Sequence, residues 1–379
     1  MKEGWEYKKL GEVATFTRGL TYSKNDEAEI SDNIVLRSNN VDLSTGKLNF
    51  DELKYLKPEF LIPEEKKVKK GSLLMCMSNG SKIHLGKVAL INDDYPYAFG
   101  GFMALVTPNE ELNPQFFNYS LSSPEYKDFI KKLSEGANIN NIKVKELELF
   151  TIPVPPLSEQ QSIVDYLDSA FAKIDAMKAN AEKALNEAKA LFQASLKEML
   201  EPKEGWVSMK LGDFAYMKAG DFVKASDIYQ DYTEGLYPCY GGNGLRGYVR
   251  EPNQEGDFCL IGRQGALCGC INRANGIFRT TEHAVIVKPY QEIPTSLVYY
   301  LLNHLNLNKY ATGAAQPGLS VKNIAEQVII SVPPLSEQQS IVATLDSLKS
   351  KVDRLQANYD KISQECDALK QAILRQVFR

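Results

Sequence analysis

The chain has 379 residues, of which 44% are hydrophobic and 24% are charged, which is ordinary for a soluble globular protein of two or three domains. It begins with neither a signal peptide nor an apolar span, and no segment approaches the ~20 apolar residues that cross a bilayer, so we expect a cytoplasmic protein without a membrane segment. The net charge is −4 and no long segment is strongly basic, so any nucleic-acid binding must depend on local patches or on a basic partner.

An internal repeat divides the chain into two halves. The run VPPLSEQQSIV occurs at 154–164 and again, unchanged, at 332–342. Upstream of each copy, an EGW motif precedes KLG, first around Trp5 and then around Trp206. The EGW copies are 201 residues apart and the VPPLSEQQSIV copies 178, so the first half carries 23 more residues between its two motifs. Because the intervening stretches share little sequence, the repeat predicts a constant frame with two different inserts.

The repeat predicts four segments in an α+β protein with a pseudo-two-fold axis. Two mixed α/β domains are expected to be joined by two long antiparallel coiled-coil helices. The expected boundaries are residues 1–152 and 203–330 for the two domains and residues 153–202 and 331–379 for the two helical spacers.

The first insert, residues 11–150, reads as short strands and helices with Gly-rich loops. Strands are expected at Leu73–Met77, Lys87–Ile91, Phe102–Thr107 and Leu149–Val154.

The first long helix is expected to begin at Ser158, because the two prolines before it prevent helix formation. Ser158 and Gln161 have the spacing of a capping box. Beyond them, apolar residues recur in heptads typical of a coiled coil, with Lys178 interrupting one row. The expected core residues of this helix include Leu167, Phe171, Ile174, Leu185 and Phe192.

The second insert, residues 212–330, is expected to form strands at Phe258–Ile261, His283–Val287 and Val328–Val332. Its sequence GNGLRG at 242–247 matches a dinucleotide-binding pattern, but Tyr248-Val-Arg follows instead of a helical pattern, so a nucleotide site is not expected. The six cysteines form no CxxC pair and lie mostly in apolar runs, which predicts buried reduced thiols and no metal site.

The second long helix repeats the first, with a capping box expected at Ser336 and Gln339 and a start at 336. Since a compact second insert returns the chain to the end of the first helix, the two helices are expected to run antiparallel. The expected core residues of this helix include Leu345, Leu348, Val352, Leu355, Ile362 and Leu369.

Polar residues at Gly-rich turns are the candidate ligand contacts. The stretch 71–80, which ends in Ser78-Asn79-Gly80, aligns with the stretch 256–265, which ends in Arg263-Gln264-Gly265. Asparagine and glutamine can pair with adenine, arginine with guanine, and lysine with phosphates. The alternative is that the asparagines, glycines and glutamines only form turns.

The repeated PPLSEQQ-IV motif behind a Gly-rich Val-Lys-x-Leu/Ile segment resembles the specificity subunit of type I restriction–modification systems. The Trp-x4-Leu-Gly opening of each half does so too. The resemblance covers essentially the whole chain. It implies two target-recognition domains, each reading half of a bipartite DNA site, and helices that set the gap between the halves.

The resemblance further implies that this chain catalyses nothing itself. Two modification subunits would bring S-adenosylmethionine and adenine methylation, and restriction subunits would use ATP and magnesium. The chain itself would bind double-stranded DNA and no cofactor, metal or membrane. The candidate DNA-contacting residues are Ser78, Asn79, Ser81, Lys82, Asn138, Asn140, Lys145, Asn243, Arg246, Arg263, Gln264, Gln316 and Lys322.

Two other functions are consistent with the residues. One is a tandem binding module for a ligand other than DNA, such as a carbohydrate. The other is an enzyme with a site centred on His84 or His283, although nothing in the sequence pairs either histidine with a nucleophile.

Overall fold

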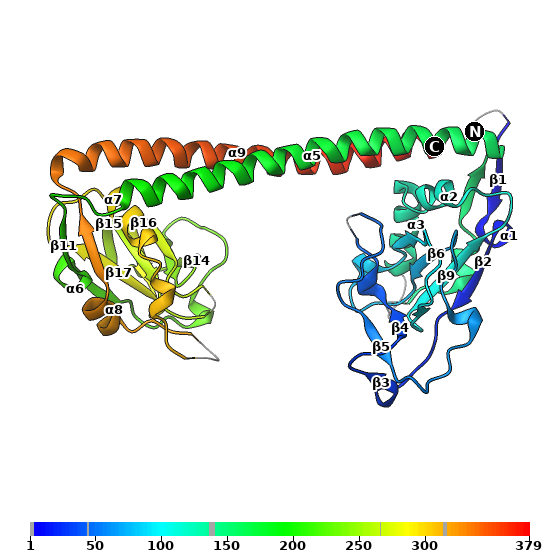
Figure 1. Ribbon diagram of the computed structural model, residues 1–379, viewed down its shortest axis with the longest axis horizontal. Helices are drawn as coiled ribbons and strands as arrows, with labels where there is room; N and C mark the ends of the chain where they lie inside the picture. The colour runs from blue at the N-terminus through cyan, green and yellow to red at the C-terminus, as the bar shows by residue number, and fades with distance from the viewer. Residues whose placement is uncertain (1–3, 44, 136–140, 266, 314–316) are drawn as a thin grey trace. The chain divides into compact units, whose positions relative to one another are not determined.

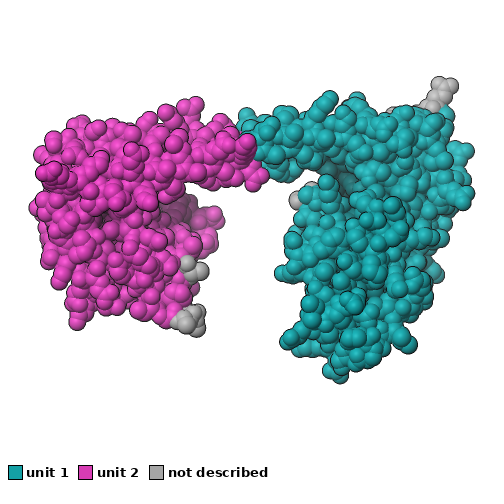
Figure 2. Space-filling model, in the orientation of Figure 1, with its two compact units in different colours: residues 1–181, 360–379 teal, residues 182–359 magenta. Residues whose placement is uncertain are grey.

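The structure is a computed structural model, and it describes residues 4–43, 45–135, 141–265, 267–313 and 317–379. The chain forms two compact units (Figure 2). Unit 1 comprises Met1–Ala181 and Asp360–Arg379, and unit 2 comprises Glu182–Tyr359. Two helices of 44 residues each, α5 (Leu157–Leu200) and α9 (Leu335–Phe378), contribute to both units. Among the described residues, none of the helices is both long and apolar enough to span a bilayer.

Unit 1 holds the first insert in a series of short elements (Figure 1). In chain order they are β1 (Glu6–Lys9), α1 (Leu10–Val13), β2 (Ala14–Arg18), η1 (Lys24–Asp26), β3 (Glu27–Ala28), β4 (Asn33–Leu36), η2 (Ser38–Asn40), β5 (Lys54–Leu56), η3 (Glu64–Lys66), β6 (Leu73–Cys76), η4 (Lys82–His84), β7 (Val88–Leu90), β8 (Ala98–Phe99), β9 (Met103–Pro108), α2 (Pro114–Ser120), α3 (Pro124–Glu135), α4 (Val144–Leu147) and β10 (Thr151–Val154).

Unit 2 holds the second insert. Its elements are β11 (Val207–Lys210), α6 (Leu211–Phe214), β12 (Ala215–Ala219), η5 (Ala225–Asp227), β13 (Tyr237–Gly241), β14 (Gly244–Val249), β15 (Gln254–Gly262), β16 (Ile271–Thr280), β17 (Ala284–Pro289), α7 (Thr295–His304), η6 (Leu307–Tyr310), α8 (Val321–Gln327) and β18 (Ile329–Val332). All the strands expected from the sequence are present, with ends shifted by a few residues. The long hairpin β15–β16 extends well beyond the expected strand at 258–261.

The sheets of the two units follow one plan. Unit 1 has four-stranded sheets of order β2-β9-β6-β7 and β3-β5-β4-β8, whereas unit 2 has one six-stranded sheet of order β12-β17-β15-β16-β13-β14. The strands β12, β17, β15 and β16 repeat the order of β2, β9, β6 and β7. The single strand β16 also pairs in parallel with β13, as the separate β8 does with β4. The two inserts therefore share a fold that their sequences scarcely reveal.

The two long helices run antiparallel in unit 1, as expected. Lys178 Nζ lies 3.5 Å from Asp367 Oδ1, and Lys370 Nζ lies 2.5 Å from Asp175 Oδ1. The residue number thus rises along α5 as it falls along α9. In unit 2 the same helices are bridged by Lys189 Nζ, which donates to Gln356 Oε1 at 2.7 Å. Unpaired charges at these places would weaken the pair, so the bridges help to fix its register.

The expected heptads describe the helix cores with one error. Of the expected core residues, Leu167, Ile174, Leu185, Phe192 and Leu345 are buried, and Phe171, Leu348, Val352, Leu355 and Ile362 are partly buried. Leu369 is 47% exposed, so its assignment to the core was wrong. Near its end α9 instead buries Leu374 and Phe378 in the core of unit 1. Packing against a domain follows the 3.6-residue period, which shifts the buried face away from the strict heptad.

Candidate nucleic-acid interface

The two repeated motifs meet in each unit and form the same joint twice. Strand β1 pairs antiparallel with β10, and β11 pairs antiparallel with β18. Trp5 Nε1 donates a hydrogen bond to Glu159 Oε1 at 2.8 Å, and Trp206 Nε1 donates to Glu337 Oε2 at 3.3 Å. We call these two strand pairs, with their tryptophan–glutamate bonds, the frame. The frame explains why both motifs recur together, because each is the other's binding partner.

A buried glutamine locks each long helix to the frame. Gln160 Nε2 donates to Pro155 O at 2.8 Å, and Gln338 Nε2 donates to Pro333 O at 3.0 Å. Both side chains are almost fully buried, so these bonds form away from water and are costly to lose. The first glutamine of each repeated Gln-Gln pair therefore has a structural role.

The predicted capping box is wrong for Gln161. The helices begin at Leu157 and Leu335, one residue earlier than expected. The carbonyl of Pro156 already accepts the amides of Glu159 and Gln160, so Gln161 lies too far along the helix to reach back. Its side chain instead bonds Asn113 Nδ2 and Asp165 Oδ1 at 2.9 and 2.8 Å.

A tyrosine from each domain anchors it to its long helix. Tyr119 of α2 donates to Asp168 Oδ1, and Tyr300 of α7 donates to Asp346 Oδ1 at 2.6 Å. Burial, together with the adjacent carboxylate, raises the pKa of both phenols, which therefore stay protonated donors at neutral pH. The two bonds are equivalent in the repeat.

A further hydrogen bond between domain and long helix, made by the buried glutamine, is present in unit 1 and missing among the described residues of unit 2. In unit 1, the Asn113 amide donates to Gln160 Oε1 at 2.8 Å, and the Asn113 side chain caps α2 by accepting from the amides of Gln115 and Phe116. The equivalent residue before α7 is Pro294, which has no N–H, and Gln338 Oε1 is buried without a partner among the described residues. The backbone angles agree, with φ −64° and ψ 125° at Asn113 and φ −54° and ψ 129° at Pro294.

We therefore expect Pro294→Asn to stabilise the protein by about 1 kcal/mol, since it supplies both an N-cap and a donor for Gln338 and loses only the rigidity of proline. Urea unfolding measures the change. Pro294→Ala, which supplies the N–H without the cap, should have a free energy of unfolding between those of the wild type and Pro294→Asn. A Pro294→Asn protein no more stable than wild type would mean that water already satisfies Gln338.

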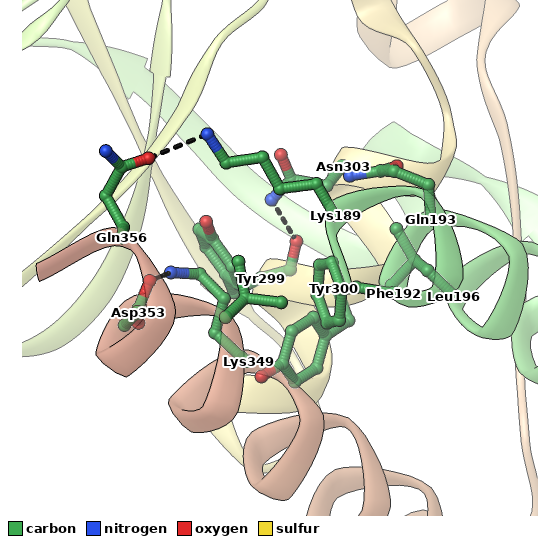
Figure 3. A pocket seen from close by; sticks show the side chains of 11 residues that line it. Lys189, Phe192, Gln193, Leu196, Tyr299, Tyr300, Asn303, Lys349, Asp353 and Gln356 are labelled. Carbon is green, nitrogen blue, oxygen red and sulfur yellow. Dashed lines mark hydrogen bonds and ion pairs between the residues drawn. The ribbon is translucent and has the colours of Figure 1, made fainter. Parts of the chain in front are cut away.

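Beside this anchor, unit 2 has a pocket of about 380 Å³ between α5, α7 and α9 (Figure 3). Phe192, Tyr299 and Tyr300 form its aromatic side, and Lys349 turns away to Asp353. At the same place in unit 1, Phe171 packs edge-on against Tyr119, with the Lys370 ammonium 5.4 Å from the centre of its ring. Position 171 corresponds to position 349 in the repeat. The space that the Phe171 ring fills in unit 1 is therefore an open pocket in unit 2, where the residue is Lys349.

The polar turn of each domain lies where the central strand ends, but the alignment expected from sequence is wrong by one residue. Met75 pairs with Val88 as Ile261 pairs with Ile271. The Met77 amide then donates to Phe102 O at 2.9 Å, and the Arg263 amide donates to His283 O at 3.0 Å. Arg263 thus occupies the position of Met77, not that of Ser78. The sequence alignment matched Gly71 with Gly256, but these glycines are not equivalent: β15 starts before Gly256, whereas β6 starts after Gly71.

In unit 1, the predicted contact residues are partly engaged within the protein. Asn79 Nδ2 donates to Ser38 Oγ at 2.9 Å, and Asn79 Oδ1 accepts the Ser81 amide at 2.9 Å. Lys82 Nζ donates to Ser134 O at 2.9 Å. Ser78 pairs with Asn141 in an isolated bridge. The geometry of Asn79 is that of a turn-forming residue, and its predicted contact with DNA would require it to exchange these bonds.

In unit 2, the predicted contact residues are more available. Gln264, Asn243 and Arg246 are exposed, the latter two on the β13–β14 hairpin. Arg263 is half-buried, and its Nε has no hydrogen-bond partner among the described residues. A guanidinium that is partly desolvated and not fully paired is suited to a polar ligand.

Lys145 and Lys322 occupy the same place in the two units, as expected. Each is the second residue of a short helix, α4 or α8, and each is exposed. Lys322 Nζ lies 4.0 Å from Glu326 Oε1, a weak contact for an exposed pair. The other predicted contacts, Asn138, Asn140 and Gln316, lie outside the described residues.

The corner between β16 and β17 contains buried polar groups that are not fully paired among the described residues. Thr281 is fully buried, and its Oγ1 has no hydrogen-bond partner in the described part of the chain. Beside it, His283 Nε2 lies 3.1 Å from Glu282 Oε1, while His283 Nδ1 is buried and unpaired within the same part. The sequence predicts His283 as the first residue of a strand, whereas β17 begins one residue later, at Ala284. The position of His283 opposite Arg263 depends on the register of the strands and cannot be read from the sequence.

The cysteines are free, and all are buried except the half-buried Cys270. Burial raises the pKa of the Cys259 thiol to about 12, so this group stays a neutral thiol and behaves as a small apolar side chain. Within the described ranges, no three histidine, cysteine, aspartate or glutamate side chains gather as a metal site would require.

Comparisons with known proteins identify the family. A model described as type I restriction modification DNA specificity domain matches residues 2–187 and 203–364. The EcoprrI specificity subunit of Escherichia coli is 34% identical over 65% of this chain and 62% of its own length. The EcoKI subunit of Escherichia coli K12 is 27% identical over 100% of this chain and 89% of its own.

Solved structures support the fold. A chain from a study of complex assembly and conformational transition in the type I R-M system superposes with a TM-score of 0.78 at 21% identity, covering 100% of this chain and 98% of its own. The HsdS subunit of Thermoanaerobacter tengcongensis gives a TM-score of 0.53 at 22% identity, covering 100% and 97%. With matched family domains in both halves and paired long helices, this chain belongs to the type I restriction–modification specificity subunits, the DNA-specificity component of a complex whose catalysis lies in other subunits.

Proposed function

We propose that each domain of this specificity subunit reads one half of a bipartite, asymmetric DNA target. The observation that carries the proposal is the contrast between the frame and the turns. The frame repeats bond for bond, from Trp5–Glu159 to Trp206–Glu337. The turn residues differ, with Met77 and Ser78 in one unit where the other has Arg263 and Gln264. One scaffold with different side chains at its strand ends suits two different base sequences.

We further propose that the candidate residues divide by role. Lys145 and Lys322, which recur at one position, would contact phosphates and add affinity without sequence preference. Ser78, Asn79, Ser81, Lys82, Asn138 and Asn140 would serve the half-site of unit 1. Asn243, Arg246, Arg263, Gln264 and Gln316 would serve that of unit 2.

The domain boundaries at 152, 202 and 330 follow from the same proposal. The helical spacers between them would set the gap between the half-sites and carry two modification subunits, one for each copy of the repeat. Restriction subunits would join these in a complete complex. S-adenosylmethionine, ATP and magnesium would be bound by those partners, and the complex would act on DNA in the cytoplasm. The names of the relatives, which are subunits of type I restriction enzymes, support this assembly.

The arginine at the second turn provides the test. We expect Arg263→Ala to relax or change only the half-site read by unit 2, at a cost of about 1–3 kcal/mol of discrimination for a lost base contact. Gln264→Ala should act on the same half-site. Sequencing of methylated adenines in cells that express each variant with the modification subunits reads both half-sites at once.

Ser78→Ala, at the position equivalent to Gln264, is the matched variant in unit 1 and should leave the half-site of unit 2 unchanged. If Arg263→Ala changed the methylated sequence in both half-sites, or in neither, Arg263 would not be a base contact for the half-site of unit 2. The family model over both halves describes a DNA specificity domain, which disfavours a tandem module for another ligand; such a module would give no salt-dependent DNA binding by the reconstituted complex.

A further inference from the structure

A second pocket in unit 2, of about 480 Å³, lies beside η5, the end of β14 and the end of β16. Three cations line it, Lys224, Arg250 and Arg279, each from a different segment of the chain. Phe222, 70% exposed, and Tyr229, 40% exposed, supply aromatic surface. None of these residues was singled out from the sequence.

The three cations are not neutralised by the described part of the protein. None of them has an ion-pair partner within 4.0 Å among the described residues, although Asp227 and Glu251 also line the pocket. Arg279 Nη1 donates to Glu251 O at 3.2 Å, a backbone carbonyl, and its Nε is buried without a partner in the same set. The pocket carries a formal charge of about +1 in a chain of net charge −4.

The equivalent place in unit 1 is closed by apolar side chains. The bridge Tyr229–Tyr248 repeats the pair Ala28–Tyr55, and the pair Cys239–Arg279 repeats Val35–Ala98. In unit 1 the small Ala98 is buried with Leu56. Tyr22, Phe60 and Ile62 pack against this cluster. The same backbone thus holds an apolar plug in one unit and an open, cation-lined pocket in the other.

We propose that the unit 2 pocket binds a phosphodiester of the DNA, at or next to the half-site that unit 2 reads. The proposal rests on the proposed function of this chain as a DNA reader. Arginine forks match phosphate oxygens in a two-pronged geometry, and a partly enclosed site strengthens the attraction. Phe222 is placed at the rim, where it can pack against the adjacent deoxyribose.

This site makes the two domains unequal. Unit 2 gains a fixed anchor on the DNA backbone, whereas unit 1 must depend on other contacts. Contacts to phosphate set the position of a protein on the duplex without reading its sequence. The anchor therefore positions the base-reading turn of Arg263 and Gln264 and does not choose the bases.

The test uses the complex of this subunit with its modification subunits and a duplex that carries the mapped target. Neutral methylphosphonate linkages replace the phosphates one at a time through both half-sites. One linkage near the half-site of unit 2 should weaken binding by the wild-type complex about tenfold, which corresponds to 1.4 kcal/mol. The double variant Lys224→Ala/Arg250→Ala should bind the unmodified duplex more weakly and become insensitive to that linkage.

The matched control is Lys57→Ala, because Lys57 occupies the position of Arg250 beside the plug of unit 1. It should leave the response to every linkage unchanged. The double variant should also lower the slope of log K against log salt by about one, as expected for the loss of one phosphate contact, and it should leave the methylated sequence unaltered.

The outcomes separate this inference from the proposed function. If the complex binds the target specifically but the double variant responds to every linkage as wild type does, the pocket does not bind a phosphate. If Lys57→Ala changes the response to the linkages as strongly as the double variant does, the effect is one of general surface charge and the pocket does not bind the phosphate. If the wild-type complex shows no specific DNA binding, it is the proposed function that fails.

Discussion

Replacing Leu345 by aspartate is expected to destabilise the protein by several kcal/mol, since it buries a carboxylate that has no partner. Leu345 is 0% exposed and belongs to the core of unit 2, where α9 packs on the domain. Its counterpart in the repeat, Leu167, is 0% exposed in the core of unit 1. A loss of this size is a large part of the ~5–15 kcal/mol that holds a typical domain folded. Urea unfolding, followed by circular dichroism, measures the loss.

Leu369→Asp is the matched control in the same helix. Leu369 was expected in the core from its heptad position, but it is 47% exposed, so the carboxylate should remain in water and the midpoint of unfolding should scarcely move. Leu355→Asp, at a half-buried position, should lie between the two. Equal effects of Leu345→Asp and Leu369→Asp would restore the strict heptad and contradict the packing described for the end of α9.

The architecture could be predicted because the repeat, the heptads and the short connection between the halves are visible in the sequence. The exact repeat gave the two halves, the heptads gave the long helices, and the short connection at residues 201–206 gave their antiparallel sense. Each of these signals can be recognised in the sequence without knowing which distant residues are in contact. The errors arose where a tertiary contact overrides the local pattern. Gln161 turns to Asn113 of the domain, and Leu374 replaces Leu369 because α9 meets the domain there.

The candidate site could be predicted only in outline. The sequence placed Lys145 and Lys322 at equivalent positions, since a Val-Lys pattern marks both. It aligned the turns one residue out, because the equivalence of Met77 with Arg263 is fixed by hydrogen bonds to Phe102 and His283 across the sheet. Such pairing over long sequence distances cannot be read from composition or spacing. The cations of the second pocket come from three separate segments and were missed for the same reason.

One glycine in each domain, at equivalent positions of the repeat, leads to the second large effect. Gly19 and Gly220 are 201 residues apart, as the Trp motifs are, so the repeat contains a signal for them. A Cβ on Gly19 would lie 2.0 Å from the carbonyl oxygen of Gly100, and one on Gly220 would lie 2.1 Å from that of Thr280. Both obstacles are backbone atoms, which cannot rotate away as a flexible side chain does. Close approach, not backbone torsion, therefore requires glycine at both positions.

We expect Gly19→Ala and Gly220→Ala each to lower the free energy of unfolding by about 3 kcal/mol or more, which is at the upper end for overpacking in a core. Each variant should destabilise mainly the unit in which it lies. Hydrogen exchange should show faster exchange at β2 for Gly19→Ala and at β12 for Gly220→Ala. Because the proposed target needs both half-sites, either variant should abolish methylation by the reconstituted complex. Gly80→Ala is the control for hydrogen exchange in unit 1, since nothing lies within 4 Å of its added Cβ. If Gly19→Ala exchanged as Gly80→Ala does and methylated as the wild type does, the strands would have room to separate, and the close crossing would not be a fixed part of either domain.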